Sequence, residues 1–383
     1  MKDSIARNRD LLREMKEILL ANVVMAAEIP SPTGGERRLS RFLSDRFTEC
    51  RLSDIADDQA GNMAGVLPGR NPRRNLLLAA HTDKVWPESE DHTVSVGVGT
   101  MSGRGIADNS LGVAVLATLP LLLERLDLQF DANLILLGTS RSFGRGNLGG
   151  MRFFLENTDR EIDGALCVEG IDLGRLSYSS LGMARGEIRA EDAGNTQSVD
   201  LATSGVISSL HSLIGRILEM NRSYYPESRI LLGTVEAVSG FNVPPQSGRL
   251  QFEIRGTDAA QVAAIEKTVV SIAASLDAES TEVDVEVEMF AHRKPGDLGV
   301  GHPLVRKARA VLGELGVKPK VEPSISELAA LLQAGIPALT LGVTKGAHRH
   351  TFRESISVDP IFDGLAQLVA VLEFMDRNGE AQS

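Results

Sequence analysis

The chain has 383 residues, of which 43% are hydrophobic and 24% charged, and its formal net charge is -11. This length favours two domains, and the composition is far from that of disordered or membrane-embedded proteins. The acidic charge argues against nucleic acid as a partner, because proteins that bind nucleic acid usually carry a basic surface.

The cysteines and the N-terminal residues indicate a cytoplasmic protein. Cys50 and Cys167 are too few for a disulfide framework, which fits a reducing compartment. The first residues lead into a segment of mixed charge rather than an apolar run, so no signal peptide is expected. No stretch approaches the roughly 20 apolar residues of a membrane helix, so we expect no membrane partner.

The first half of the chain alternates helical and strand patterns. Apolar residues recur at helical spacing over 11–23, a break follows at 31–36, and a second helix is expected over 37–47. Buried strands are expected at four apolar runs, with two helices among them: strands 64–67, 76–80, 134–137 and 165–168, helices 111–123 and 148–156. This alternation predicts an α/β fold with a doubly wound sheet, whose sites lie at the carboxyl ends of the strands.

From about residue 181 the pattern changes, which predicts an inserted α+β domain over 181–289. Its expected elements are strands 185–190, 231–238, 250–255 and 283–289 and helices 207–220 and 259–276. The earlier pattern resumes with helices 304–315, 328–334 and 361–375 and a strand 338–342. The catalytic-type domain is therefore predicted to comprise residues 1–180 and 290–383, and the insert to form a lid that dimerises.

Three side chains near strand ends are candidate metal ligands. His81 follows the strand 76–80 and Glu169 follows the strand 165–168, while Asp108 lies in a loop before the helix at 111. Imidazole and carboxylate groups are ligands that suit zinc. A competing interpretation is that Arg141 and Arg145 pair with these carboxylates and exclude the metal.

Several motifs, in this order and spacing, carry a family resemblance. They are His81-Thr82-Asp83-Lys84-Val85, the segment 103–109, Gly233-Thr234-Val235-Glu236 with Asn242 and Arg255, Ser326-Glu327, Gly335-Ile336-Pro337, and His350-Thr351 with Glu354. Together they resemble the di-zinc peptidase family that includes acetylornithine deacetylase, succinyl-diaminopimelate desuccinylase, glutamate carboxypeptidase and aminoacylase. The likeness extends over nearly the whole chain.

The resemblance implies a role for each candidate residue. His81 and Glu169 would bind one zinc ion, Asp108 would bridge to a second ion, and His350 would bind that second ion. Asp83 would hold the ring of His81 in orientation. The peptide bond that follows Asp108 would be cis.

Two glutamates that the family pattern requires are missing. Ser142 stands at the position of the general base, and Phe143 stands at the position of the glutamate that binds the second metal. Serine cannot serve as a general base at neutral pH, and a general base is worth roughly 10²–10⁴ in rate. At most one zinc ion is therefore expected to be well held.

A third departure lies in the inserted domain. Asn195 stands where the resemblance expects a histidine that reaches across a dimer to polarise the scissile carbonyl. Asn242 and Arg255 resemble residues that bind a substrate carboxylate, and both are present. Binding groups are thus better preserved than groups that carry out the chemistry.

Three functional hypotheses follow. The first is a homodimeric zinc metallopeptidase or amidohydrolase for small peptides or N-acyl amino acids, with impaired or absent activity. The second is a non-catalytic homodimer that binds a carboxylate-bearing metabolite through Asn242 and Arg255. The third is hydrolysis with a single metal ion and a different base.

Overall fold

The computed structural model describes residues 2–194, 205–224, 228–241, 243–280 and 282–378 and divides into two compact units. Unit 1 comprises Met1–Ser180 and Asp297–Ser383, and unit 2 comprises Leu181–Gly296. The predicted α/β fold class is confirmed. The predicted boundary at 289/290 is too early, because strand β13 (Val283–Arg293) continues to Arg293 within the sheet of unit 2.

A seven-stranded sheet forms the centre of unit 1, in the order β1-β2-β6-β3-β7-β15-β8. The pairs β3–β6, β3–β7 and β7–β15 are parallel, and the pairs toward both edges are antiparallel. Its strands are β1 Ser53–Asp57, β2 Met63–Leu67, β3 Asn75–His81, β6 Asn133–Thr139, β7 Gly164–Ile171, β15 Ala338–Thr344 and β8 Leu176–Ser177. The carboxyl ends of the parallel strands lie along one edge of this sheet.

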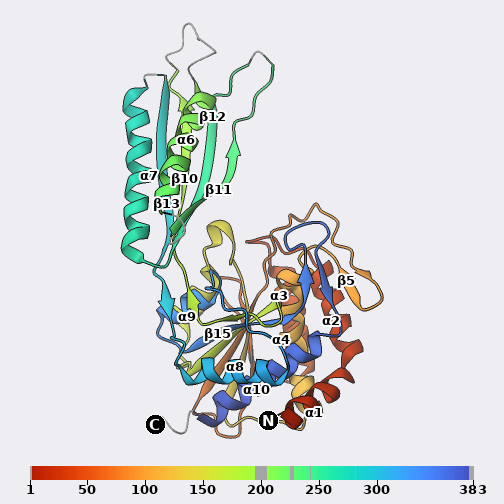
Figure 1. Ribbon diagram of the computed structural model, residues 1–383. Helices are drawn as coiled ribbons and strands as arrows, with labels where there is room; N and C mark the ends of the chain where they lie inside the picture. Colours follow the sequence, from red (N-terminus) through yellow and green to blue (C-terminus); the bar gives the residue numbers. More distant parts are fainter. Residues whose placement is uncertain (1, 195–204, 225–227, 242, 281, 379–383) are drawn as a thin grey trace. The chain divides into compact units, whose positions relative to one another are not determined.

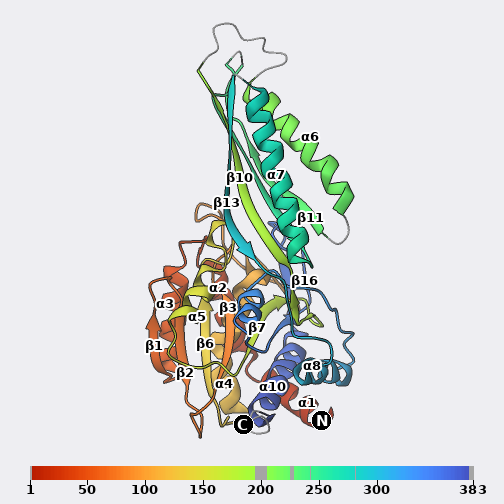
Figure 2. The ribbon, with the colours of Figure 1, turned by 90° about the vertical axis from the view of Figure 1, so that its left-hand side faces the viewer.

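Helices cover both faces of this sheet (Figures 1 and 2). Successive strand residues point to opposite faces, so Leu76 and Leu78 pack into one apolar cluster and Leu77 and Ala79 into another. The first cluster includes α1 Lys2–Arg13, α2 Lys16–Glu28, α3 Arg37–Glu49, α4 Leu111–Arg125, α8 Pro303–Glu314 and α10 Ile361–Asn378. The second includes residues of α5 Gly149–Asn157 and α9 Leu328–Gln333. Burial on both faces explains the continuous apolar runs of the central strands.

The N-terminal segment forms two helices, whereas the sequence predicts one over 11–23. Helices α1 and α2 are separated at Glu14 and Met15, where the backbone N–H of Met15 bonds the carbonyl of Leu12 at 3.0 Å. This tight turn lets α1 pack beside α10, so the first and last helices of the chain are neighbours (Figures 1 and 2).

A small sheet in unit 1 supports the loop that carries His350. Its strand order is β16-β17-β5-β4, and none of these short strands is predicted from the sequence. The strands are β16 Gly346–Ala347, β17 Ser355–Ser357, β5 Thr100–Ser102 and β4 Ser95–Val96. The loop between β16 and β17 is thereby tied to the segment that leads to Asp108.

Unit 2 consists of an antiparallel sheet with two helices on one face (Figures 1 and 2). The strand order is β11-β12-β10-β13, with β10 Gly182–Asp192, β11 Ser228–Glu236 and β12 Ser247–Gly256, and the helices are α6 Val206–Tyr224 and α7 Ala259–Glu279. Residues such as Ile188 and Ile254 pack against Ile265 of α7. The opposite face of the sheet carries charged side chains, among them Arg185 and Glu253.

Two helical stretches are long and apolar enough to cross a membrane by length and composition alone: Ile106–Arg125 and Ala259–Glu279. Helices at 111–123 and 259–276 are predicted from the sequence, but the expectation that no stretch reaches the length of a membrane helix is wrong by this criterion. The first is 94% buried inside the structure, as is typical of a core helix, and the second packs one apolar stripe onto the sheet of unit 2. Such helices are weak evidence for membrane insertion.

Candidate metal centre

Three predicted ligands meet at the carboxyl edge of the central sheet. His81 ends β3, Glu169 lies near the end of the neighbouring strand β7, and Asp108 lies in the turn η1 (Ile106–Ser110) before α4. Their ligand atoms lie within 4.8 Å of one another, and all three side chains are buried. The parallel pairing of β3 and β7 explains this convergence, because it places the two strand ends side by side.

Asp108 forms hydrogen bonds with two imidazoles, one at each carboxylate oxygen. Nε2 of His81 lies 2.9 Å from Oδ1, and Nε2 of His350 lies 2.7 Å from Oδ2. Burial acts to raise the pKa of Asp108, but the hydrogen bonds from His350 and His81 outweigh it and lower that pKa well below its usual range. The peptide bond that follows Asp108 is cis, as the resemblance implies.

The other nitrogen of His81 faces Asp83. Nδ1 lies 3.0 Å from the backbone carbonyl oxygen of Asp83 and 3.6 Å from its Oδ1. Because a carbonyl oxygen only accepts, Nδ1 carries a proton in this contact. Nε2 donates to Asp108 in this structure, and a metal ion bound by His81 would take the place of that Nε2 proton. Burial acts to lower the pKa of His81, but its bonds with Asp108 and Asp83 raise that pKa well above its ordinary value.

The carboxylate of Asp83 organises the loop that follows β6. Its Oδ2 accepts hydrogen bonds from Oγ1 of Thr33 at 2.8 Å and from the backbone N–H groups of Ser142 and Phe143 at 2.8 and 2.9 Å. Burial acts to raise the pKa of Asp83, while the contacts with His81 and these donors lower it overall. Asp83 therefore fixes the position of residues 142–143 beside His81.

Phe143 occupies the position at which the resemblance expects the second metal's glutamate. Its ring lies edge-on to the ring of His81, with centroids 5.0 Å apart, and edge-on to that of His350 at 6.2 Å. A phenyl ring offers no ligand atom, so Asp108 and His350 are the candidate donors that this position brings together. Two donors are too few for a tetrahedral zinc site.

Two arginines lie near the carboxylates of the centre. Nη1 of Arg349 is 3.7 Å from Oδ2 of Asp108, and Nη1 of Arg175 is 4.0 Å from Oε2 of Glu169. The competing interpretation of the sequence named Arg141 and Arg145 for this pairing, and neither Arg349 nor Arg175 was predicted. Arg349 is in the His350 loop, and no local pattern distinguishes it from a solvated loop residue.

A further buried carboxylate, to which the sequence assigns no role, lies close to the centre. Glu327 precedes α9 and is 2% exposed. Its Oε1 accepts hydrogen bonds from Oγ of Ser142 at 2.5 Å and from Oγ1 of Thr139 at 3.3 Å. The available signal was the motif Ser326-Glu327 before a short apolar helix, which identifies no chemistry by itself.

Three of the predicted site residues belong to unit 2: Asn195, Asn242 and Arg255. Asn195 and Asn242 fall outside the described residues. Arg255 lies on β12, where its Nε donates to Glu253, and Arg185 of β10 donates to the same carboxylate. Burial acts to raise the pKa of Glu253, but these two guanidinium groups lower it overall. The charge of Arg255 is therefore already paired in this structure.

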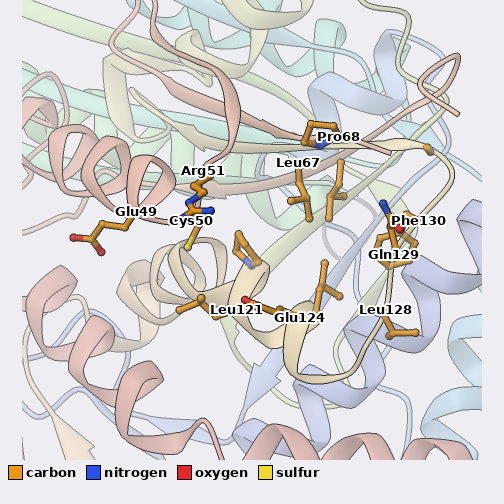
Figure 3. Close-up of a pocket in the computed structure, with 14 residues that line it drawn as sticks. Glu49, Cys50, Arg51, Leu67, Pro68, Leu121, Glu124, Leu128, Gln129 and Phe130 are labelled. Atoms are coloured by element: carbon orange, nitrogen blue, oxygen red, sulfur yellow. The ribbon is translucent and has the colours of Figure 1, made fainter. Parts of the chain in front are cut away.

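A pocket that is separate from the metal centre lies elsewhere in unit 1. A cavity of about 520 Å³ is lined by the end of α3, by α4 and by the segment that leads into β6, including Cys50, Glu124 and Phe130 (Figure 3). It reaches Leu134 at the start of β6, whereas His81 pairs with Thr139 at the other end of that strand. The cavity is thus at the opposite edge of the sheet from the metal centre.

The sequence of this chain matches the model of a known protein family. The model of peptidase family M20/M25/M40 matches residues 77–373, which is more than half of the sequence. The chain belongs to this peptidase family. No curated protein matches the M20 chain closely enough to count as a relative.

Solved structures share the fold of this M20 chain. A tripeptidase from Staphylococcus aureus is 16% identical, with a TM-score of 0.73 over 94% of this chain and 99% of that one. The dipeptidase Dug1p from Saccharomyces cerevisiae is 12% identical, with a TM-score of 0.75 over 98% and 99%. The YXEP protein from Bacillus subtilis, described as a dinuclear metal-binding peptidase, is 14% identical, with a TM-score of 0.64 over 95% and 99%. At these identities the likeness shows the fold alone.

The M20 family typically binds two metal ions, and the two positions of this chain differ in their fit. The first offers an imidazole and two carboxylates from His81, Asp108 and Glu169, which is a complete set of three protein ligands for a catalytic zinc ion. At the second position Phe143 replaces the anionic donor. The donor set fits one ion and does not fit two.

Proposed function

We propose that this M20 protein hydrolyses the amide bond of a small peptide or an N-acyl amino acid with one metal ion, expected to be zinc. The observation that carries the proposal is the buried cluster of His81, Asp108 and Glu169 at the carboxyl edge of the sheet. Three protein ligands with one open position are typical of catalytic zinc sites. The descriptions of the S. aureus tripeptidase and the yeast dipeptidase support the substrate class.

The residues around the centre hold its ligands in orientation. The carbonyl of Asp83 holds the tautomer of His81 that presents Nε2, and Glu354 holds the backbone at Asp108. A divalent ion bound here supplies Lewis-acid chemistry, because it lowers the pKa of water and polarises a carbonyl oxygen. The oxygens of Asp108 and Glu169 provide the negative charge that retains such an ion.

The proposed activity is slow compared with that of a two-metal enzyme. Position 142 carries no carboxylate, and a general base contributes roughly 10²–10⁴ in rate. Substrate binding is proposed to involve Asn242 and Arg255, and unit 2 is proposed to serve as a lid that forms a homodimer. Arg255 would have to exchange its contact with Glu253 for the substrate carboxylate.

Elemental analysis and a hydrolysis assay test the proposal together. We expect one equivalent of metal per chain in protein purified without chelator, and amine release from N-acetylalanine, N-acetylglutamate or alanylglycine. Glu169→Gln should lose both the metal and the activity, whereas Glu161→Gln, at an exposed position just before the same strand, should keep both. Activity that persists in metal-free Glu169→Gln protein would refute the metal mechanism.

The alternative hypothesis of a non-catalytic binder predicts a different result in the same experiment. No hydrolysis would then occur, and N-acetyl amino acids would still raise the thermal midpoint of the protein. Arg255→Ala would abolish that shift. Hydrolysis by the wild-type protein rules out this alternative.

A further inference from the structure

A buried carboxylate lies directly behind position 142, where the family pattern expects a glutamate. Ser142 is 7% exposed, and its hydroxyl donates to Oε1 of Glu327 at 2.5 Å. Glu327 is 2% exposed and comes from a segment 185 residues further along the chain. Position 142 itself has no carboxylate, but the hydroxyl of Ser142 is hydrogen-bonded to the carboxylate of Glu327.

Glu327 differs from the other buried carboxylates in what surrounds it. Among the residues that the structure describes, it forms no ion pair with a lysine or arginine, and its side-chain donors are the neutral hydroxyls of Ser142 and Thr139. Asp83, in contrast, accepts two backbone N–H bonds. The carboxylate of Glu327 is therefore weakly held as an anion, and an anion buried in this way is costly.

The charged groups that face Glu327 belong to the metal centre. Burial raises the pKa of Glu327, the charges of His81 and the bond from Ser142 act to lower it, and Glu169 adds to the increase. The charge of Glu327 also acts on Cys167 of β7, whose pKa burial raises. A carboxyl group with a raised pKa beside a reaction centre is typical of proton acceptors that operate near neutral pH.

The backbone of Ser142 is fixed relative to His81. The Oδ2 atom of Asp83 accepts the N–H of Ser142 at 2.8 Å, and the carbonyl of the same Asp83 accepts Nδ1 of His81 at 3.0 Å. One residue therefore positions both the metal ligand and the hydroxyl. Ser142 stands between the metal centre and Glu327 along this chain of contacts.

Building on the proposed function, we propose that Ser142 and Glu327 together form the proton acceptor of the hydrolysis, in place of the glutamate missing at position 142. As water adds to the carbonyl carbon, one O–H bond of the water breaks and its proton passes to Oγ of Ser142. The original Ser142 proton passes along the existing hydrogen bond to Oε1 of Glu327. When the C–N bond breaks, the reverse transfer delivers a proton to the leaving nitrogen and restores both side chains. Glu327 is a positioning residue that acts through Ser142.

Four variants of the metal-loaded protein test this proposal, with N-acetylalanine, N-acetylglutamate and alanylglycine as probes. Glu327→Gln keeps an oxygen that accepts from Ser142 but cannot take up a proton. We expect this variant and Ser142→Ala to lose about 10²–10⁴ in rate while they keep their metal. Asp376→Asn alters a buried carboxylate that bonds the backbone of Asp131 and Ala132, and it should keep the wild-type rate. The double variant Ser142→Glu/Glu327→Gln should recover activity.

Two readouts separate a proton acceptor from a merely structural carboxylate. The acidic limb of the pH–rate profile should disappear in Glu327→Gln and return in the double variant. Infrared spectra of the metal-loaded protein without substrate should show a protonated carboxyl band that grows as the pH falls along this acidic limb, that Glu327→Gln removes and that Ser142→Ala shifts.

The outcomes distinguish this inference from the proposed function. Wild-type hydrolysis that is unchanged in Glu327→Gln would overturn the Ser142–Glu327 acceptor and leave the proposed function intact. A loss of activity that the double variant does not recover, although it folds and binds metal, would also overturn the acceptor. No hydrolysis of any probe by the wild-type protein would overturn the proposed function itself, and with it any catalytic use of the pair.

Discussion

The ring of Phe143 packs edge-on against the imidazole of His81, with an interplanar angle of 87° and centroids 5.0 Å apart. An aromatic ring therefore stands beside a metal ligand, on the side where His350 approaches Asp108. This contact contributes apolar packing in place of an anionic oxygen. Without that oxygen the second ion lacks a ligand, so this centre fits one ion, whereas the centre typical of the family holds two.

Phe143→Glu is expected to create the missing position. The new carboxylate would join Asp108 and His350, which supplies the second ion with a third protein ligand. Elemental analysis of protein purified without chelator should then rise from one to two metal equivalents per chain. Phe143→Leu, which removes the ring without adding a ligand, should stay at one. Two equivalents in the wild-type protein would show that another group already completes the second position.

Arg349 is expected to weaken metal binding through its charge. Its guanidinium lies 3.7 Å from Oδ2 of Asp108, where it competes with a cation for the same carboxylate. Because Arg349 is partly exposed, the effect is modest, about 0.5–1 kcal/mol, or a two- to fivefold gain in affinity for Arg349→Gln. Competition with a fluorescent chelator measures this gain. Arg353→Gln, at an exposed position in the same loop, should leave the affinity unchanged.

The strand ends of the metal centre could be predicted from the sequence. Strands β3 and β7 are buried along their whole length, so each appears as an uninterrupted apolar run. His81 and Glu169 stand out at the ends of those runs. Parallel pairing then places them side by side, which a pattern of alternating strands and helices already implies.

The contacts of Glu327 and Arg349 could not be predicted in the same way. Ser142 and Glu327 are 185 residues apart, and the direction of each side chain depends on how α9 packs against the sheet. Arg349 lies in a loop between two strands that are each two or three residues long. Such short strands carry no readable alternation of apolar and polar residues, so tertiary packing alone determines where this loop goes.

Glu354→Gln is expected to destabilise unit 1. The carboxylate of Glu354 is fully buried and accepts the backbone N–H groups of Ala107, Asp108 and His350 at 2.8, 3.0 and 3.0 Å. The glutamine amide would turn a donor toward at least one of these N–H groups, which costs about 1–3 kcal/mol of unfolding free energy.

Urea unfolding measures this loss. The exposed substitution Glu322→Gln is the matched control and should stay within about 0.5 kcal/mol of the wild-type protein. Because Glu354 joins the Asp108 turn to the His350 loop, its substitution should also reduce metal content. Unchanged stability in Glu354→Gln would mean that the three N–H groups find other acceptors.

Lys84 is expected to make stability depend on pH between neutral and alkaline conditions. Its side chain is 1% exposed, and Nζ donates to the carbonyls of Ala26, Ala27 and Ile29 at 2.8, 2.9 and 2.7 Å. Burial lowers the pKa of Lys84 to about 7, whereas an unfolded chain retains the proton to about 10.4. Between these values the unfolded state binds more protons, so the free energy of unfolding rises with pH.

The comparison that isolates this effect is the difference in unfolding free energy between the wild-type protein and Lys84→Met. That difference should be constant below about pH 7 and then increase in favour of the wild-type protein by at most about 1.4 kcal/mol per pH unit, because one proton is released. Urea unfolding at about pH 6, 7.5 and 9 measures it. Lys267→Met, at an exposed position of α7, should show no such trend. A constant difference for Lys84→Met would show that the three carbonyls keep the ammonium charged in the folded protein, so that hydrogen bonding outweighs burial at this position.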